Sequence, residues 1–528
     1  MYLPENTYGN IEYKWKLINL DESQLLEKKM TQLKFRLNEG NGEAIYFIGV
    51  RDNGYIEGIT REEMNISMNY LNIMIKKLGL YSILLFENQI KNDLFYRKIL
   101  IQDKNHFDYI DIKIGMIGNV DSGKSTLTSV ITNGCKDNGR GSARILIFNH
   151  QHEKETGRTS SIGHQFVGFD DNGEIIHKKK NSQKKWIDII NNKSKKIITF
   201  FDLAGHERYL KTTIYGLSSF NLDYCIVVIG ANMGINHMTR EHISVCLALN
   251  IPIIIVFTKI DIAPINIMEE NWKKIELMCN RRLKKIPIKF NNKEDILDYL
   301  HKDNILPIFE VSNLNLSNMN LLEYYLSLLY PRKNYDYEKR ENFKLQIDEK
   351  YSITGFGTVV SGIVKSGKIK INDNVYIGPD EFGNFMTSKI KSIHIKLKNV
   401  NELSAGIYGC LCLKNIDKQY IKKGMVILDE NSPRKSVLRF WAIITVHKTN
   451  STTIKENYQP FVHIENIRQT VKLLSIQKIT NKDSDFIRNG DEAKVHLEFK
   501  YKAEYIEKNM KLLFRDGLIK ASGFIIDL

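Results

Sequence analysis

The chain has 528 residues and only six cysteines, none of which form a C-x-x-C pair. That spacing argues against a zinc knuckle and a disulfide framework, and it favours a reduced, cytoplasmic location. The first residues lack the apolar run of a secretory signal. The longest apolar stretches, residues 225–231 and 251–257, are far shorter than the roughly 20 residues that cross a bilayer. We therefore expect no membrane association.

The balance of charge is strongly basic, with a net charge of +15 and a pI near 9.2. Such a balance favours a polyanionic partner, such as nucleic acid or the ribosome. Alternatively, a composition rich in Asn, Lys and Ile reflects an AT-rich genome, and part of the charge is solvated surface. The lysine-rich insert 178–196 around Trp186 has the same two interpretations. We favour a solvated loop, because one tryptophan makes no stacking platform.

The length predicts several domains. Residues 1–110 combine an amphipathic stretch at 61–78 with strand-like segments at 32–37, 43–50 and 81–86, which predicts a small α+β domain. Residues 111–335 alternate apolar strands with helical patterns, which predicts an α/β domain with a mostly parallel sheet. Short alternating strands with glycine turns follow, and they predict two β-barrels at 340–430 and 435–528.

A phosphate-binding motif stands between a predicted strand and a predicted helix. Residues 118–125, GNVDSGKS, satisfy G-x-x-x-x-G-K-[ST]. In such a loop the backbone N–H groups surround the phosphates, the lysine reaches the β- and γ-phosphates, and the serine hydroxyl binds Mg²⁺. The residues expected to contact the nucleotide here are Gly118, Asn119, Val120, Asp121, Ser122, Gly123, Lys124, Ser125 and Thr126.

A second motif, DLAGHE, closes a later strand. We expect Asp202 to hold Mg²⁺ through water and the Gly205 N–H to contact the γ-phosphate. His206 is placed to orient the attacking water. A lone histidine would more often be structural, but its position in this motif favours catalysis.

A third motif, TKID, ends the strand at 253–257 and indicates the base. The Asp261 carboxylate can accept the N1 and N2 hydrogens of guanine, and adenine offers no such pair of donors. We expect Thr258 and Lys259 to contact the nucleotide, with the aliphatic stem of Lys259 over the base. Ser312 and Asn313 follow the next strand, where a last loop would cover the purine. The expected ligands are therefore GTP and GDP with Mg²⁺.

Four ordered elements, GNVDSGKST, GRTSS, DLAGHE and TKID, resemble the translational GTPases related to elongation factor Tu. The segments RLNEGNGEAIYFIGVRDNGY, GRGSAR, YQPFVHIENIRQT and LLFRDGLIKASG resemble the GTP-binding protein one and two subgroup, so the resemblance covers almost the whole chain. It implies that Thr159 completes the Mg²⁺ site, and that His206, Lys124 and Thr159 act in hydrolysis. Residues 355–362, GFGTVVSG, resemble a turn in the first β-barrel of these translational GTPases.

The resemblance also implies partners. Relatives hold aminoacyl-tRNA with the two barrels and the GTPase domain, hydrolyse GTP on the ribosome, and act as monomers. Thr258 departs from the pattern, since most relatives have asparagine there. The loss of one hydrogen bond at this position predicts that the nucleotide binds more weakly, by about 1–2 kcal/mol of binding free energy.

Three functions stay open. The first is a translational GTPase that delivers aminoacyl-tRNA or rescues stalled ribosomes. The second is a GTP-switched regulator of mRNA turnover that docks the decay machinery through residues 1–110. The third is a metabolic coupling GTPase, against which the charge argues. A selenocysteine factor would carry further C-terminal domains, and an initiation factor two gamma subunit would carry a cysteine knuckle, so neither is expected.

Overall fold

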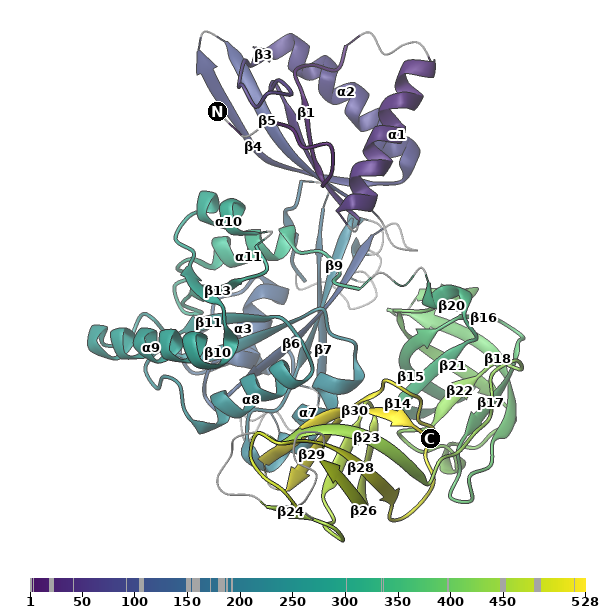
Figure 1. Ribbon diagram of the computed structural model, residues 1–528. Coiled ribbons are helices and arrows are strands. Elements are labelled where there is room, and N and C mark those ends of the chain that lie inside the picture. Colours follow the sequence, from purple (N-terminus) through teal and green to yellow (C-terminus); the bar gives the residue numbers. More distant parts are fainter. Residues whose placement is uncertain are drawn as a thin grey trace.

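The computed structural model describes the chain except for residues 1, 3, 19–22, 41, 92, 104–108, 149–152, 154–161, 171, 179–185, 187–188, 191–192, 301, 334, 336, 397, 447–452, 479–485 and 517. Figure 1 shows an N-terminal α+β domain at the top, a central α/β domain below it, one β-barrel to the right and a second at the bottom. Within the described residues, none of the helices combines the length and the hydrophobicity that crossing a lipid bilayer requires.

The N-terminal domain is a five-stranded sheet with two helices on one face. Helix α2 begins with a capping box between Thr60 and Glu63 and ends at Gly79 in the left-handed conformation. The strands expected at 43–50 and 81–86 and the helix expected at 61–78 are confirmed. The elements are β1 (Ile11–Lys14), α1 (Ser23–Glu39), β2 (Glu43–Ile48), β3 (Ile59–Thr60), α2 (Arg61–Leu78), β4 (Tyr81–Lys91) and β5 (Leu94–Gln102).

The strand predicted at residues 32–37 is wrong, because this segment lies inside α1. Its letters alternate polar and apolar over six residues, which mimics a strand. Over the longer window, however, Leu26, Leu33 and Leu37 recur at helical spacing, and all three are buried against the sheet. Phe35, which the alternation would also bury, is exposed. Burial of the helical stripe therefore decides the local structure.

The central domain is built on an eight-stranded sheet in the order β12-β13-β11-β10-β6-β9-β7-β8. The strands from β12 to β9 are parallel, β7 is antiparallel to β9, and β8 is antiparallel to β7. The expected parallel sheet is confirmed. The elements are β6 (Ile110–Gly118), α3 (Lys124–Asn133), α4 (Ser142–Ile145), β7 (Gly163–Phe169), β8 (Ile175–Ile176), β9 (Lys196–Asp202), α7 (Leu210–Ser219), β10 (Tyr224–Gly230), α8 (His237–Ala248), β11 (Ile253–Thr258), α9 (Ile265–Met278), β12 (Ile286–Lys289), α10 (Lys293–Tyr299), β13 (Ile305–Glu310) and α11 (Met319–Leu328).

The N-terminal sheet is apolar on both faces. The face away from its own helices carries Ile45, Phe47 and Leu100, and these share one buried cluster with Leu322 and Tyr325 of α11. The two domains therefore share one hydrophobic core.

Two β-barrels follow, as expected. In the first barrel, β17 pairs with both β22 and β18, which closes the ring. The second barrel is closed and has six strands, in the order β23-β28-β26-β25-β29-β30. The first contains β14 (Lys344–Ile353), β15 (Gly357–Ser366), β16 (Lys368–Lys370), β17 (Asn374–Gly378), β18 (Met386–Ile395), β19 (Lys398–Val400), β20 (Glu402–Ser404), β21 (Tyr408–Lys414) and β22 (Val426–Leu428). The second contains β23 (Arg439–Val446), β25 (Phe461–Ile464), β26 (Ile467–Lys478), β28 (Glu492–Phe499), β29 (Lys511–Asp516) and β30 (Leu518–Asp527), with a small β24 (Ile454–Lys455) and β27 (Phe486–Ile487) pair beside them.

Helix α7 contacts both barrels. The Tyr215 hydroxyl donates to Asp348 Oδ1 of the first barrel at 2.9 Å, and the Ser218 hydroxyl donates to the Glu465 carbonyl of the second at 2.7 Å. Burial raises the pKa of Asp348 to about 7, while the Tyr215 hydrogen bond and the charge of Lys365 act in the opposite direction. An acid with a raised pKa therefore lies where three domains meet.

This burial predicts a pH-dependent stability. The folded pKa of Asp348 lies above its ordinary value of 3.8, so the folded protein holds the proton more tightly than the unfolded chain. Stability then falls as the pH rises from about 4 to about 7, by at most about 1.4 kcal/mol per pH unit. Asp348→Asn keeps an acceptor for Tyr215 and should flatten this slope, as measured by urea unfolding from pH 4 to 8. An unchanged slope would contradict the assignment, and Asp380→Asn, at an exposed loop, is the control.

Candidate nucleotide site

The phosphate-binding motif joins β6 to α3. Strand β6 ends at Gly118 and α3 begins at Lys124, with Gly123 as its left-handed N-cap residue. Asp121 also has a positive φ, of 59°, so the chain curls between strand and helix. The backbone N–H groups of the first helical turn therefore point toward this loop, which suits an anion.

The second motif lies against this loop. Lys124 Nζ is 3.2 Å from Asp202 Oδ1, and both side chains are almost fully buried. A Cβ on Gly205 would come within 2.4 Å of the Gly118 carbonyl oxygen, so only glycine permits this approach. Burial and the charge of Lys124 lower the pKa of His242 on α8 to about 4, so that imidazole is neutral beside the lysine.

His206 stands at the edge of the same loop and is partly exposed. Its Nδ1 accepts the Arg208 N–H at 3.1 Å, and its ring meets that of Tyr209 edge-on at 6.2 Å. The hydrogen bond to Nδ1 leaves Nε2 as the nitrogen that can face a ligand.

The third motif braces the phosphate loop from the side of β11. The Thr258 hydroxyl donates to the Ser122 carbonyl oxygen at 2.5 Å, and both residues are buried. A Cβ on Gly123 would lie 3.2 Å from Thr258 Oγ1 and 3.4 Å from Asn313 Nδ2, so these two side chains flank the loop. A threonine therefore keeps the bracing contact.

The Asp261 side chain is hydrogen-bonded to Ser312, which belongs to the predicted loop after β13. The Ser312 hydroxyl donates to Asp261 Oδ1 at 2.5 Å, and Ser312 Oγ accepts the Leu314 N–H at 3.2 Å. Lys259, between Thr258 and Asp261, has a left-handed φ of 60°. The Ser312–Asn313 loop and the TKID loop thus form one side of the site.

A small hollow of about 40 Å³ lies over the phosphate loop and gathers most of the predicted residues. Thr159 lies outside the described residues. Arg144 of α4 also lines this hollow, and the sequence prediction missed it, since arginines occur on any solvated loop. The only signal was its place in GRGSAR. The lining residues are Asn119, Val120, Asp121, Ser122, Gly123, Lys124, Ser125, Thr126, Arg144, Gly205 and His206.

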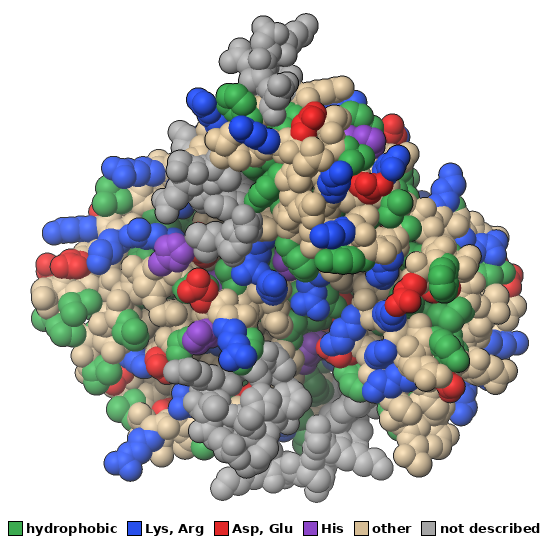
Figure 2. All heavy atoms as spheres, turned by 90° about the horizontal axis from the view of Figure 1, so that it is seen from below, with side chains coloured by type: hydrophobic (Ala, Val, Ile, Leu, Met, Phe, Trp, Pro, Cys, Tyr) green, Lys and Arg blue, Asp and Glu red, His purple; other side chains and the backbone are tan. Residues whose placement is uncertain are grey.

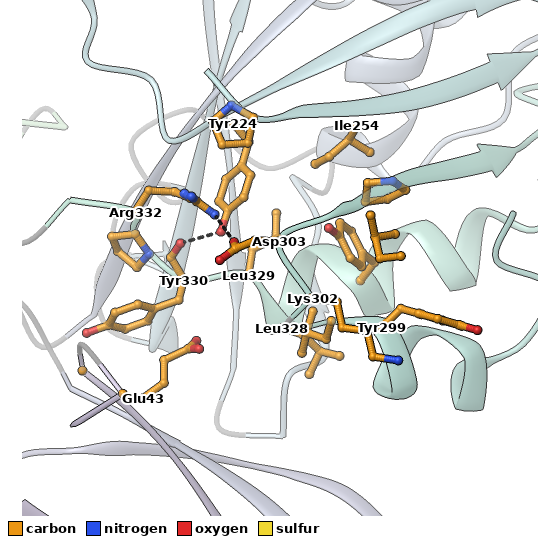
Figure 3. Close-up of a pocket in the computed structure, with 18 of the residues that line it drawn as sticks. Glu43, Tyr224, Ile254, Tyr299, Lys302, Asp303, Leu328, Leu329, Tyr330 and Arg332 are labelled. Atoms are coloured by element: carbon orange, nitrogen blue, oxygen red, sulfur yellow. Dashed lines mark hydrogen bonds and ion pairs between the residues drawn. The ribbon is translucent and has the colours of Figure 1, made fainter. Parts of the chain in front are cut away.

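A larger cavity of about 690 Å³ lies between the N-terminal and central domains. Figure 3 shows Tyr224, Tyr330, Arg332 and Asp303 together on its wall, with Glu43 of β2 facing them. The Tyr224 hydroxyl donates to the Tyr330 carbonyl at 3.0 Å, and Arg332 is 3.5 Å from Asp303. The cavity opens at the amino ends of β10, β11 and β13, the opposite edge from the phosphate loop. None of the predicted nucleotide residues lies in it.

Comparison with known proteins identifies the class. Residues 111–331 match the family described as Elongation factor Tu GTP binding domain, and residues 357–428 match Elongation factor Tu domain 2. The fold is similar to translation elongation factor SelB from Methanococcus maripaludis bound to the GTP analogue GPPNHP, with a TM-score of 0.57, 20% identity and 80% of each chain covered. It is also similar to a bacterial selenocysteine-specific elongation factor, EF-Sec, with a TM-score of 0.56 and 20% identity, covering 79% of this chain and 58% of that one. The chain is a GTP-hydrolysing enzyme of the elongation factor Tu class.

Curated relatives narrow this class. GTP-binding protein 1 from Xenopus laevis is 40% identical over 507 residues, which is 94% of this chain and 75% of that protein. GTP-binding protein 2 from Homo sapiens is 36% identical over 542 residues, which is 99% of this chain and 88% of that protein. The apicoplast elongation factor Tu of Plasmodium falciparum is 25% identical over 430 residues, or 80% of this chain and 96% of that protein. The chain belongs to the family of GTP-binding proteins 1 and 2.

The brace between Thr258 and Ser122 predicts a measurable effect. Thr258→Val keeps the shape but leaves the buried Ser122 carbonyl without this donor, which should destabilise the protein by about 1–3 kcal/mol and speed GDP dissociation. Urea unfolding and the release of a fluorescent GDP analogue measure the two effects. Thr132→Val in α3 makes the same chemical change, but its hydroxyl donates within the helix to the Thr128 carbonyl. GDP release from Thr258→Val no faster than from Thr132→Val would contradict the brace.

Proposed function

We propose that the phosphates of GTP lie in the hollow over residues 118–126 and that guanine pairs with Asp261. The hollow combines the N-terminus of α3 with the Lys124 ammonium, which together favour a polyphosphate. The carboxylate of Asp261 is oriented by Ser312, and Asn313 flanks the loop from the same side. These contacts support the roles proposed for the phosphate loop, Asp261 and Asn313, and we propose in addition that the stem of Lys259 lies against the base.

We also propose that Mg²⁺ binds with the nucleotide. Ser125 offers a hydroxyl oxygen, and Asp202 offers a carboxylate beside Lys124. Oxygen donors of this kind fit Mg²⁺, which commonly keeps several waters and binds one or two protein groups plus phosphates. Among the described residues no group of three His, Cys, Asp or Glu side chains could by itself hold a metal ion. When bound, the ion would offset charge on the terminal phosphates. Thr159 is the further ligand proposed from the resemblance.

For hydrolysis we propose that His206 orients the attacking water. It lines the hollow together with Gly205, whose N–H is the donor proposed for the γ-phosphate. Its Nδ1 is engaged by the Arg208 N–H, which fixes the ring. We further propose that threonine in place of asparagine at position 258 weakens binding of the purine and thereby favours spontaneous nucleotide exchange.

Base choice gives a direct test. In Asp261→Asn one carboxylate oxygen becomes an amide donor, which matches xanthine, where a carbonyl replaces the amino group of guanine. Affinity for GTP should fall by about 100-fold or more, and affinity for xanthosine triphosphate should rise correspondingly. Competition against a fluorescent GTP analogue measures both. The wild-type protein with ATP is the negative control, and wild-type GTP affinity in the variant would contradict the assignment.

We propose that the chain acts as a GTP switch with aminoacyl-tRNA and the ribosome, in delivery or in rescue of stalled ribosomes. The observation that carries this proposal is a hollow of about 1020 Å³ in the first barrel. Phe356 and Tyr420 line it with rings 50% and 57% exposed, and Lys391, Lys414 and Lys418 line it with positive charge. Exposed rings among lysines suit a single-stranded RNA end, whose bases stack and whose phosphates pair.

The distribution of charge supports the same class of partner. Figure 2 shows lysine and arginine side chains spread over the face seen from below, with acidic side chains between them. A net charge of +15 spread in this way suits a large polyanion that contacts several domains rather than one small anionic ligand. We propose that the protein meets these partners as a monomer in the cytoplasm.

The test is protection of the ester bond of aminoacyl-tRNA against spontaneous hydrolysis, with GTP, GDP or ATP at two salt concentrations. We expect protection with GTP alone, weaker at high salt because phosphate contacts release counterions. The double variant Phe356→Ala, Tyr420→Ala should lose it, while Phe382→Ala, at an exposed ring outside the hollow, should keep it. No protection in any state, with GTP still bound, would overturn delivery. The mRNA-turnover regulator or the metabolic coupling GTPase would then be tested in its place.

A further inference from the structure

The turn that leads into α4 is organised by one carboxylate. Asp137 accepts the backbone N–H groups of Gly139 at 3.0 Å, Gly141 at 3.2 Å and Ala143 at 3.0 Å. A ring of such bonds fixes the path of the chain from residue 137 to the start of the short helix. The conformation of the turn that leads into α4 is therefore set by hydrogen bonds within residues 137–143.

The same turn is tied to both sides of the nucleotide site. The buried Ser129 hydroxyl of α3 donates to the Ala143 carbonyl at 2.6 Å. The Asp137 N–H donates to the Asn313 carbonyl at 3.0 Å, so the turn also contacts the loop beside Asp261. A side chain on α4 is thus held in register with the phosphate loop and with the base loop.

Arg144 is the α4 side chain that reaches the phosphate hollow. It lines the hollow together with Lys124, Gly205 and His206. Its guanidinium lies across Gly141, since a Cβ there would come within 2.4 Å of Arg144 Nε and 2.8 Å of Cζ. Gly141 therefore leaves the space in which the guanidinium rests.

Within the described part of the chain, Arg144 forms no ion pair with a carboxylate, whereas Lys124 is paired with Asp202. Guanidinium groups keep their charge and present five donors in a rigid plane, which matches phosphate oxygens. A cation placed in this way beside the phosphate loop suits a phosphate oxygen as its partner.

We propose that Arg144 supplies, within the same chain, a guanidinium to the terminal phosphates of bound GTP and speeds their hydrolysis. The inference rests on the proposed placement of the phosphates over residues 118–126. In the reaction, the water oxygen bonds to the γ-phosphorus and the bond from that phosphorus to the β–γ bridging oxygen breaks. GDP leaves with the electron pair, and the proton of the water ends on the released phosphate. Charge shifts to the bridging and γ-oxygens, where a fixed cation lowers the barrier.

The first test compares Arg144→Ala with Arg140→Ala, a matched loss of charge at an exposed arginine of the same turn that does not line the hollow. Single-turnover hydrolysis of bound GTP should fall by about 100-fold or more in Arg144→Ala and stay near the wild-type rate in Arg140→Ala. A binding readout accompanies it. Affinity for GDP with aluminium fluoride, which mimics the transferring phosphoryl group, should fall much more than affinity for GDP alone.

A second pair of variants leaves the arginine in place. Gly141→Ala puts a methyl group where the guanidinium lies, and should slow hydrolysis as Arg144→Ala does. Gly139→Ala imposes similar backbone strain, since its φ is 78° against 86° at Gly141, but its Cβ meets only Leu314 at 3.8 Å. Gly139→Ala should therefore hydrolyse GTP faster than Gly141→Ala at equal stability, as checked by thermal unfolding.

Lys124→Ala separates this inference from the proposed site. If Lys124→Ala binds GDP as the wild type does, the placement of the phosphates is wrong. If Lys124→Ala loses GDP but Arg144→Ala hydrolyses GTP within about twofold of Arg140→Ala, the site stands and the role of Arg144 is overturned. The role of Arg144 in hydrolysis would also be overturned if Arg144→Ala lost GDP and GTP affinity equally and hydrolysed bound GTP at the wild-type rate. The guanidinium would then contact the phosphates equally in the ground state and in the transition state.

Discussion

Parallel pairing of β6 with its two neighbours is the constraint on which the site depends. Because β9, β6, β10, β11 and β13 all run in one direction, their carboxyl ends share one edge of the sheet. The loops after β6, β9, β11 and β13 carry the GNVDSGKS, DLAGHE and TKID motifs and the Ser312–Asn313 pair, which together span residues 118–313. Side-chain contacts then lock the loops together: Lys124 with Asp202, Thr258 with Ser122, and Ser312 with Asp261. Each of these contacts joins two different motifs, so displacing one loop displaces its neighbour.

The same edge is mechanically connected to the barrels. The loop that ends in His206 continues through a 3-10 turn, Glu207–Tyr209, into α7, and α7 donates hydrogen bonds to both barrels. Around these bonds lie Lys365 and Glu465, 3.5 Å apart, so the junction is polar and buried. Buried polar contacts are costly when they are half made, which favours discrete arrangements of α7 over gradual displacement. Helix α7 is therefore one element that connects the edge carrying the phosphate loop to both barrels.

What the sequence could and could not predict follows from the range of each signal. Residues 118–126 and the strand ends were predictable, because spacing and apolar runs are local and parallel strands are buried on both faces. Residues 32–37 were misassigned, because six letters of alternation are shorter than the helical stripe around them. The Thr258 brace was not foreseen, since a substitution for asparagine indicates a lost purine contact but not where the hydroxyl points. Arg144 was missed because its role depends on Gly141 and Ser129, and only tertiary packing makes that visible.

The N-terminal domain is the part whose meaning changes most once the fold is known. As a sequence, residues 1–110 resemble a separable module that could dock a partner. In the structure, one face of its sheet is buried with α11, and α11 begins soon after the Ser312–Asn313 loop. The Tyr81 hydroxyl also donates to the Asp170 carbonyl, at the end of the β7 strand that pairs with β9. A partner bound to its outer helices would therefore act on a body continuous with the base loop. Removing the domain would therefore uncover apolar residues of the GTPase domain, including Leu322 and Tyr325 of α11.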